Sequence, residues 1–384
     1  MDHLTEIGNA KREQPRLLIG QNGPIVIAIV GITSESGDLR EELRKAKIAE
    51  QVGADMIADV STVFNSTEIH SELLTELTIP VSTVPLYEIW RIASKRGEWP
   101  KQLSSNLILD VIEKQAELGV DCMTLHSAFT LSQLNAIDQS GRGIQMQARG
   151  GGLIRQFMAS TGKENPLFEC FDDILMILRK NHVSVSIGCS CRTGTVDDPI
   201  DDIIWQEALV QAQLVRDCRE NNVPVMVEGL SHIRYGLIKP YVRSMKSLTD
   251  GAPLRLLGPI STEKGLGYDH ITAAISATEA VIAGVDALTC VTRAEHIGIP
   301  DEEELREAVV ATKIAIEVAK QNWNRETEKS SFRCGMGFSK LNKDDVIDYN
   351  KALELKKLKS GDVIDSCQMC NETCPLILME EDDI

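Results

Sequence analysis

Three cysteines near the end of the chain have the spacing that most directly indicates chemistry. Cys367, Cys370 and Cys374 form a Cys-x2-Cys-x3-Cys run, and Pro375 follows the third cysteine. Three thiolates in such a run can bind three irons of a cubane cluster, and a proline after the last thiolate is typical of ferredoxin-type runs. The remaining iron would have no protein thiolate and would be open to a substrate or cofactor. The spacing therefore predicts an open 4Fe-4S site.

Structural zinc is the main alternative for this run. A tetrahedral zinc site normally has a fourth protein ligand, which only Cys334 or a distant histidine could supply. A third possibility is that the thiols bind no metal. Two further cysteines, Cys189 and Cys191 in the string GCSCR, could form a pocket wall, a redox pair or additional ligands. A disulfide framework is not expected, because no secretory signal opens the chain and a reducing cytosol keeps thiols free.

Two histidines could form a second metal site. His232 in EGLSH and His270 in GYDHIT lack the H-E-x-x-H spacing, so each could also be an ordinary core or loop histidine. Two neutral imidazoles from neighbouring loops can hold zinc or iron and leave positions open to water or substrate. One use of such a site is hydrolysis, with Glu228 as the base.

The elements that must position these residues follow a regular alternation. Short β-branched, apolar runs close with small or polar residues, and each precedes a stretch with helical periodicity. Because the runs are apolar on successive residues, both faces should be buried, as in parallel strands. Eight βα units over about 300 residues predict a TIM-type (β/α)8 barrel, and a doubly wound open sheet is the alternative. The runs are 24–31, 54–61, 79–85, 121–128, 183–189, 223–229, 253–259 and 287–292.

Helix ends and domain limits follow from the same pattern. The helical stretches 38–53 and 104–119 end on a glycine suited to a C-cap. The stretch 301–321 opens with acidic residues, which suit the positive end of the helix dipole. We expect a polar leader over 1–23, a barrel over 24–322 and a tail over 323–384 that carries the cysteine run.

Polar residues that follow the strands should gather at one end of the barrel. In this fold the active site lies at the C-terminal ends of the strands. A glycine-rich insertion over 140–152 falls on the same face, and such loops are more often functional than idle. By this rule the candidate rim residues are Asp59, Ser61, Tyr87, His126, Cys189, Cys191, Arg192, Glu228, His232, Glu263, Thr292, Glu295 and His296.

Composition excludes several classes of partner. The chain has 384 residues, of which 43% are hydrophobic and 25% charged, and its formal net charge is −17. That charge repels phosphate backbones and anionic lipid, and no basic patch opposes it. The longest apolar runs are well short of the ~20 residues that a membrane span needs. We therefore expect a cytoplasmic protein that binds neither nucleic acid nor a membrane.

A series of strings in a fixed order carries a family resemblance. From about residue 24 to 376 the chain resembles the phosphomethylpyrimidine synthase (ThiC) family, whose paralogues include 5-hydroxybenzimidazole synthase of anaerobic cobamide biosynthesis. Most of the strings are weak alone, and their order and spacing make the resemblance strong. They are GADMIADVST, PVSTVPLYE, GVDCMTLHSA, ARGGG, VPVMVEGLSH, LGPISTEKGLGYDHITAAI, ALTCVTRAEHIGIPDEEELREAV and CQMCNETC.

The resemblance implies an enzyme with bound cofactors. Members of the family are non-standard radical S-adenosylmethionine enzymes with a (β/α)8 barrel and a cysteine-rich tail that holds a 4Fe-4S cluster. The open iron binds S-adenosylmethionine, and reduction by a donor such as flavodoxin or ferredoxin yields a 5′-deoxyadenosyl radical. The radical starts the rearrangement of aminoimidazole ribotide to the hydroxymethylpyrimidine phosphate of thiamine. The tail reaches the barrel of a second subunit, so the resemblance also implies a homodimer.

The resemblance assigns the family's site positions to individual residues of this chain. The resemblance implies that the three tail cysteines bind the cluster and that His232 and His270 bind a mononuclear zinc or iron. It also implies that Glu228 serves catalysis as well as substrate binding. The substrate-contacting positions are Tyr87, His126, Arg149, Gly150, Arg192 and Glu228.

The chain departs from the family pattern in the expected substrate pocket. The family's first-strand asparagine is Ile29, its methionine before D-x-S-T is Ala58, and its D-G-L-R-P-G motif begins at Cys189. The family's tyrosine just before L-G-P is Arg255, which adds a cation near the expected phosphate. These exchanges spare the cluster and metal positions. We therefore expect radical generation to be retained and substrate recognition to differ, with a paralogous ribotide reaction or a non-catalytic metal-binding barrel as alternatives.

Overall fold

The computed structural model describes residues 5–20, 23–33, 37–63, 66–322, 343 and 346–360. The chain divides into two compact units, Met1–Ala319 and Lys320–Ile384. The described part of the second unit contains helix α13 (Tyr349–Ser360). The cluster cysteines Cys367, Cys370 and Cys374 lie outside the described residues, as does Cys334, so the iron–sulfur site and its zinc alternative stay predictions.

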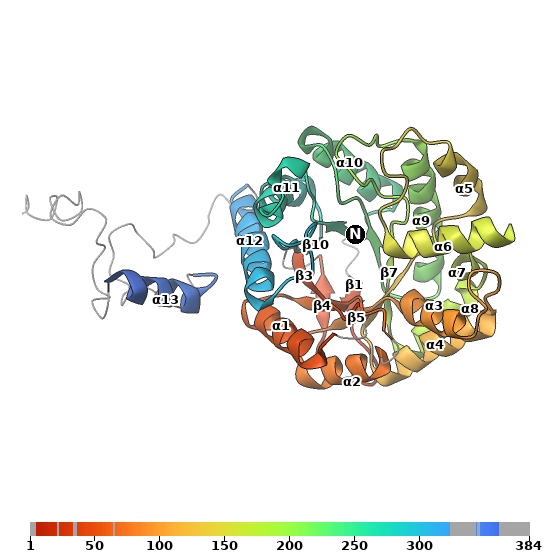
Figure 1. Ribbon diagram of the computed structural model, residues 1–384, viewed down its shortest axis with the longest axis horizontal. Helices are drawn as coiled ribbons and strands as arrows, with labels where there is room; N and C mark the ends of the chain where they lie inside the picture. Colours follow the sequence, from red (N-terminus) through yellow and green to blue (C-terminus); the bar gives the residue numbers. More distant parts are fainter. Residues whose placement is uncertain are drawn as a thin grey trace, which may run out of the picture. The chain divides into compact units, whose positions relative to one another are not determined.

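The first unit is a closed barrel. Among the described residues, eight parallel strands pair in the order β10-β3-β4-β5-β6-β7-β8-β9 and close on themselves (Figure 1). This confirms the predicted (β/α)8 barrel, since each strand falls inside one of the eight predicted runs, and it excludes the open sheet. The strands are β3 (Ile25–Val30), β4 (Met56–Asp59), β5 (Val81–Thr83), β6 (Cys122–Leu125), β7 (Ser184–Ile187), β8 (Val225–Glu228), β9 (Leu254–Leu257) and β10 (Ala287–Thr289).

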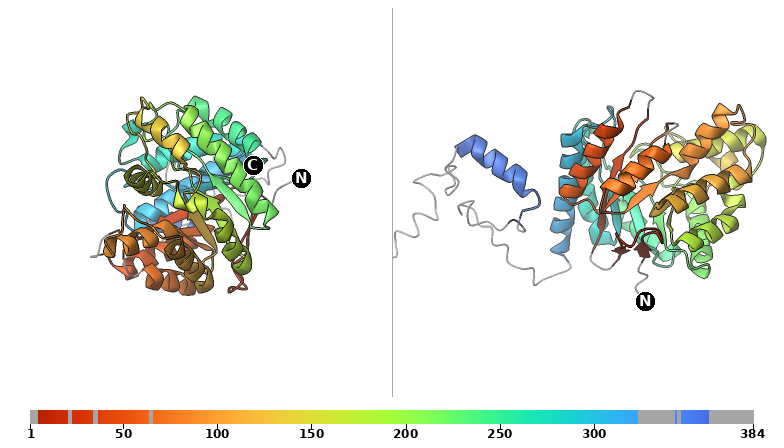
Figure 2. Two further views of the ribbon diagram at one scale, coloured as in Figure 1. Left: turned by 90° about the vertical axis from the view of Figure 1, so that its right-hand side faces the viewer. Right: turned by 90° about the horizontal axis from the view of Figure 1, so that it is seen from below.

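Helices surround the strands (Figures 1 and 2). Among the described residues, no helix combines the length and apolar character needed to cross a membrane. The helices of this unit are α1 (Leu39–Gln51), α2 (Ser66–Glu76), α3 (Pro85–Lys95), α4 (Ser105–Leu118), α5 (Leu131–Asp138), α6 (Arg149–Thr161), α7 (Pro166–Glu169), α8 (Phe171–Asn181), α9 (Asp202–Glu220), α10 (Tyr235–Leu248), α11 (Asp269–Ala283) and α12 (Glu302–Lys320), with the 3-10 turn η1 (Glu263–Gly265) before α11.

Local chemistry explains where three of these helices begin or end. Helix α1 begins after Asp38, whose side chain accepts a hydrogen bond from the Arg40 backbone N–H at 2.9 Å. Helix α4 ends at Gly119, which has φ 111° and can adopt the left-handed conformation without a Cβ clash. Helix α12 begins with three glutamates, which favour the positive end of the helix dipole.

A β-hairpin covers the N-terminal end of the barrel. Strands β1 (Thr5–Ile7) and β2 (Leu17–Ile19) pair antiparallel, and Figure 2 shows them in dark red beside the barrel strands. Ile7 and Ile19 are fully buried in a cluster with residues from the barrel interior, and Thr5 Oγ1 donates to the Val225 carbonyl at 3.0 Å. Part of the stretch that sequence analysis treats as a polar leader therefore packs into the barrel unit.

The barrel interior contains a buried polar layer. TIM-barrel interiors are usually filled by bulky branched residues. Here an apolar cluster near the hairpin gives way, toward the C-terminal ends of the strands, to five buried polar side chains that hydrogen-bond to one another. We call this set the polar layer. It consists of Thr124, Ser186, Glu228, Arg255 and Thr289.

Candidate active site at the barrel mouth

Glu228 is the centre of the polar layer. It is the last residue of β8, and its Oε1 accepts hydrogen bonds from Arg255 Nη1 at 3.1 Å, Thr124 Oγ1 at 3.4 Å and Ser186 Oγ at 3.5 Å. Its Oε2 lies 4.0 Å from Arg192 Nη1. One carboxylate therefore lies between two guanidinium groups, with three donors on one oxygen.

The charges around Glu228 keep it ionised. Burial by itself raises the pKa of this carboxyl, but the surrounding groups, of which Arg255 has the largest effect, lower it more. The pKa of Glu228 therefore lies below its ordinary value. The sequence predicts that Arg255 adds a cation near a substrate phosphate. In the structure Arg255 is buried in the barrel interior, where its charge is paired with Glu228.

His126 presents a neutral imidazole to the same region. It follows β6 and is fully enclosed, and burial lowers its pKa to about 4. Its ring packs against two glycines: a Cβ on Gly150 would lie 2.4 Å from His126 Cε1, and one on Gly188 would lie 3.0 Å from Cδ2. Its Nδ1 has no hydrogen-bond partner among the described residues. The site thus holds an uncharged ring with a free nitrogen.

Tyr87 and Arg149 meet on another side of the mouth. Tyr87 lies in the first turn of α3, after β5, and burial raises the pKa of its hydroxyl. Arg149 is the first residue of α6, and its guanidinium lies 5.4 Å from the centre of the Tyr87 ring. Arg149 Nη1 also donates to the Val60 carbonyl at 3.2 Å. The two predicted substrate residues are therefore in direct contact.

The loop after β7 is held by a buried carboxylate. Glu207 of α9 accepts from the backbone N–H groups of Ser190 at 2.6 Å and Cys191 at 2.7 Å, and its Oε2 lies 3.6 Å from Cys189 Sγ. Burial raises the pKa of both thiols well above the ordinary value. Neutral, enclosed thiols favour the pocket-wall interpretation of Cys189 and Cys191 over a redox pair. The same loop carries Arg192, the other guanidinium beside Glu228.

The glycine-rich insertion is tied to that loop. Arg142 donates to Asp201 from Nε, at 2.8 Å, and from Nη2, while its Nη1 donates to the Cys191 carbonyl at 2.6 Å. Asp198 accepts from the backbone N–H of Gly143 at 2.8 Å. Gln147 accepts from Arg192 Nε at 3.2 Å and from Ser231 Oγ at 2.6 Å. The insertion therefore forms part of the mouth, as expected from its place after the fourth barrel strand.

The histidine pair has ring nitrogens available for a metal. His232 Nδ1 lies 3.1 Å from Glu263 Oε1, and burial lowers the pKa of His232. His232 Nε2 and His270 Nδ1 are buried without a hydrogen-bond partner among the described residues. Such nitrogens fit a pair of metal ligands, and the Glu263 carboxylate would orient the His232 ring. In the part of the chain that the structure describes, no group of three or more potential ligands is placed to bind a metal.

His296 belongs to the same corner of the site. Its ring centre lies 5.2 Å from that of His232, and its Nδ1 lies 3.2 Å from Asp269 Oδ1. Asp269 precedes His270 in the first turn of α11. The predicted rim residues Glu263 and His296 therefore contact or neighbour the two candidate metal ligands.

Two neighbouring cavities open among these residues. They have volumes of about 190 and 90 Å³, and Ile29, Cys290 and Glu295 line both. The smaller one also reaches Arg192 and His232. Ile29 stands where the resemblance expects an asparagine, so this departure does fall on a cavity wall. Burial raises the pKa of Glu295 above its ordinary value.

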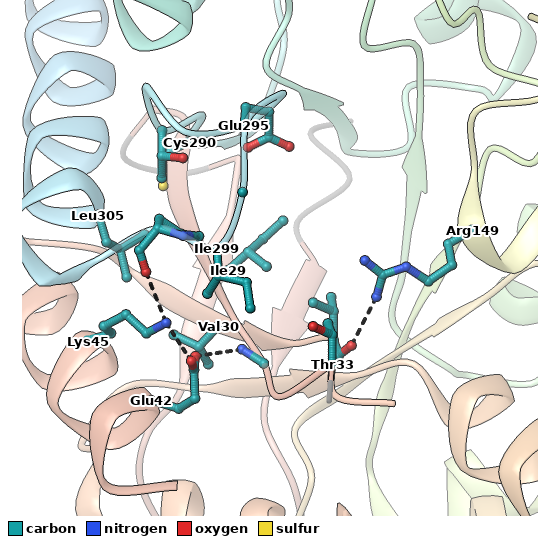
Figure 3. Close-up of a pocket in the computed structure, with 15 residues that line it drawn as sticks. Ile29, Val30, Thr33, Glu42, Lys45, Arg149, Cys290, Glu295, Ile299 and Leu305 are labelled. Carbon is teal, nitrogen blue, oxygen red and sulfur yellow. Dashed lines mark hydrogen bonds and ion pairs between the residues drawn. The ribbon is translucent and has the colours of Figure 1, made fainter. Parts of the chain in front are cut away.

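The larger cavity exposes residues that sequence analysis did not single out. Figure 3 shows Glu42 and Lys45 on one side and Arg149 opposite them. Lys45 Nζ lies 2.5 Å from Glu42 Oε1, and Glu42 Oε2 accepts from the Gly31 backbone N–H at 2.8 Å. In sequence the two charges look like ordinary solvent-facing positions of α1. Only their three-residue spacing, which places opposite charges on one helix face, hinted at a pair. Glu207 and Gln147 were also not predicted as site residues, because nothing in the adjacent sequence marks either one as a partner of the loop after β7.

Two predicted rim residues, Asp59 and Ser61, hydrogen-bond to loop residues and do not line either cavity. Asp59 Oδ1 accepts from Ser61 at 2.6 Å, and Asp59 Oδ2 lies 2.9 Å from His70 Nε2. Ser61 Oγ in turn accepts from the Ile32 backbone N–H at 2.9 Å. Asp59 and Ser61 thus anchor the loop after β3, while Ala58 is buried in the apolar cluster near the hairpin.

Comparison with known proteins finds relatives that are similar over nearly the whole chain. The phosphomethylpyrimidine synthase of Methanocaldococcus jannaschii is 37% identical over 386 aligned residues, covering 99% of this chain and 90% of that protein. The phosphomethylpyrimidine synthase of Carboxydothermus hydrogenoformans is also 37% identical, covering 93% and 84%. Among solved structures, a Coxiella burnetii dihydropteroate synthase in complex with pteroic acid matches with 12% identity and a TM-score of 0.48, covering 84% of this chain and 100% of that chain. A likeness at that level supports no conclusion about function.

The family profile matches almost the whole chain. The profile described as "Radical SAM ThiC family" matches residues 5–381, which include the barrel, its mouth and the tail cysteines. Together with relatives that are similar over nearly their full length, this match confirms the resemblance seen in the sequence. The chain belongs to the Radical SAM ThiC family.

Proposed function

We propose that this protein is a phosphomethylpyrimidine synthase-like lyase that converts aminoimidazole ribotide to the hydroxymethylpyrimidine phosphate of thiamine. The observation that carries the proposal is the family match over residues 5–381, together with relatives of that name at 37% identity. The barrel mouth supports it, because Tyr87, His126, Arg149, Arg192 and Glu228 all lie around one end of the barrel in mutual contact or near contact.

The protein's own groups suit a ribotide. Glu228 is an ionised acceptor for an amino or hydroxyl group, and His126 is a neutral ring that adds no charge. Arg149 and Arg192 line the two cavities and offer guanidinium groups to a phosphate. Because most of these side chains are buried, bound substrate would be shielded from water, which radical chemistry requires.

The cofactors would be held by two sets of residues. Cys367, Cys370 and Cys374 would bind the 4Fe-4S cluster, which with S-adenosylmethionine supplies a 5′-deoxyadenosyl radical. His232 and His270 would hold the mononuclear zinc or iron through their orphaned nitrogens, where the metal can orient a substrate or cofactor group. We further propose a homodimer with exchanged tails, reduced by a flavodoxin or ferredoxin in the cytoplasm.

An anaerobic assay tests the proposal. Reconstituted protein is mixed with a reductant, S-adenosylmethionine and aminoimidazole ribotide, and products are identified by mass spectrometry. We expect 5′-deoxyadenosine and the pyrimidine phosphate, and loss of both in Cys370→Ala. The absence of 5′-deoxyadenosine with every imidazole ribotide would contradict the proposal, as would preparations that hold only zinc and no iron or acid-labile sulfide.

A paralogous reaction is the second candidate. Ile29 lies on the cavity wall and Arg255 pairs with Glu228, at positions where the family resemblance expects an asparagine and a tyrosine. These changes favour a related product such as 5-hydroxybenzimidazole, which the same mass spectrometry distinguishes. Binding of S-adenosylmethionine without cleavage would instead indicate a non-catalytic metal-binding barrel.

The hydrolytic zinc interpretation has less support. A general base works best when its pKa lies near the working pH, whereas the pKa of Glu228 lies below its ordinary value. Three donors also occupy its Oε1. Glu228 is therefore better suited to accept hydrogen bonds than to remove a proton from water.

A further inference from the structure

The Arg255–Glu228 pair lies in the barrel interior, one side chain away from the smaller cavity, which Thr289 and Arg192 line. Both side chains are 4% exposed, and the pair joins adjacent strands, β9 and β8, in register. Arg255 Nε also donates to Thr289 Oγ1 of β10 at 2.8 Å. From one strand the guanidinium thus bonds to both neighbouring strands, which fixes its position.

This arrangement leaves the two oxygens of Glu228 in different states. Oε1 accepts from Arg255 and from the hydroxyls of Thr124 and Ser186, whereas the nearest charged group to Oε2 is Arg192, at 4.0 Å. An ionised carboxylate accepts hydrogen bonds but donates none. The backbone N–H of Cys189 also hydrogen-bonds to this carboxylate. Oε2 is the oxygen on the side of Arg192, which lines the smaller cavity, and a ligand that reaches Oε2 must bring an N–H or O–H.

We propose that Arg255 is the specificity-determining residue of this site, because it occupies Oε1 of Glu228 and fixes the carboxylate so that Oε2 selects a substrate amino group. The inference rests on the proposed function, since it assigns the amino group of an aminoimidazole ribotide to this oxygen. Arg255 acts through Glu228 and is a positioning residue.

The charge of Arg255 explains why the preference for an amino group would be strong. A neutral side chain at position 255, such as the tyrosine that the family resemblance expects, offers no counter-ion to the buried Glu228 carboxylate. With Arg255 in place, a ligand without the amino group displaces water from Oε2 and gives it no hydrogen bond in return, which is costly for a charged group. A ligand with the amino group makes a charge-assisted hydrogen bond instead.

Calorimetric titration of the reconstituted holoenzyme tests this. The two probes are aminoimidazole ribotide and the same ribotide without its amino group. We expect the wild type to bind the amino compound about tenfold or more tightly, the effect of one hydrogen bond to a charged group. Arg255→Met should reduce the preference to about threefold or less, and Arg255→Lys should keep only part of it, because the cation is retained but the second bond of the guanidinium, to Thr289, is lost.

Matched variants separate recognition from folding. Arg219→Met removes a guanidinium that pairs with Asp250 at 3.1 Å on the outer surface, and it should leave the preference unchanged. Arg255→Met leaves a buried carboxylate without its main partner, so Arg255→Met/Glu228→Gln removes both charges and should fold with no preference. Thermal unfolding of each variant verifies the fold.

The outcomes distinguish this inference from the proposed function. A folded Arg255→Met or double variant that keeps the wild-type preference overturns the inference, as does a productive wild type that binds both ribotides equally. A wild type that binds neither ribotide and forms no product overturns the proposed function instead.

Discussion

At the scale of single residues, the site combines groups whose charge states are set by burial. Glu228 is held as an anion, while His126 and the two thiols of the β7 loop are held neutral. Sequence position predicted that these residues share the barrel mouth, because strand ends converge in this fold. Their charge states could not be predicted, because desolvation and long-range pairs such as Arg255–Glu228 depend on the folded interior.

His126 should make stability depend on pH. Its pKa is about 4 when folded and 6.5 as an ordinary histidine, so between these values the unfolded chain binds more protons than the folded one. Stability should therefore fall as pH drops from 6.5 toward 4, by about 3 kcal/mol in total. Urea unfolding midpoints at a series of pH values measure this. His126→Gln should remove most of the slope, whereas the exposed His182→Asn should keep it.

A second residue-scale prediction concerns the space around His126. Gly150→Ala would bring a Cβ to 2.4 Å from the imidazole and displace the ring, so ribotide affinity should fall by tenfold or more, an estimate of about 1.4 kcal/mol or above. Gly152→Ala, two residues along the same helix, meets nothing within 4 Å and should bind ribotide normally. Equal affinity in both variants would show that the ring position is unimportant for binding. Titration calorimetry gives both values.

At the scale of elements, the mouth depends on loops that fasten one another. Hydrophobic runs predicted all eight barrel strands, and glycine or acidic ends predicted helices α1, α4 and α12. That the 140–152 insertion has a fixed conformation could not be predicted. It comes from contacts such as Arg142–Asp201, whose partners lie 59 residues apart in sequence.

Asp198 should control the order of the insertion. Its carboxylate accepts from the backbone N–H groups of Gly143, Gly194 and Thr195 at 2.8, 3.0 and 3.1 Å. Asp198→Ala leaves these donors without their acceptor, so amide hydrogen exchange over 140–148 should quicken by about tenfold or more. The neighbouring Asp197→Ala, whose side chain is 86% exposed, should leave exchange there unchanged. Slow exchange in Asp198→Ala would mean that other contacts order the insertion.

At the scale of the barrel unit, the N-terminal hairpin completes the interior. The polar composition of residues 1–23 predicts a leader segment. Burial of Ile7 and Ile19 against the barrel interior was not predictable from such short apolar segments. The prediction of the barrel itself succeeded because its signal is repeated eight times, whereas a three-residue strand has no periodicity to detect.

The hairpin should contribute measurably to stability. Ile19→Ala removes a fully buried side chain and should cost about 2–5 kcal/mol of unfolding free energy. Leu18→Ala, one residue earlier on the opposite face, is 39% exposed and should cost less than about 1 kcal/mol. Chemical denaturation compares the two. Similar losses of unfolding free energy in both variants would show that packing of the hairpin against the barrel interior does not stabilise the protein.

The hydrogen bond from Thr5 to Val225 also bears on how the chain is made. The two residues are 220 positions apart, so Thr5 leaves the ribosome long before its acceptor has been translated. During that interval the apolar side chains of the hairpin lack the complete barrel interior against which they pack in the folded protein. Nascent chains arrested before β8 should therefore recruit chaperones through this opening segment.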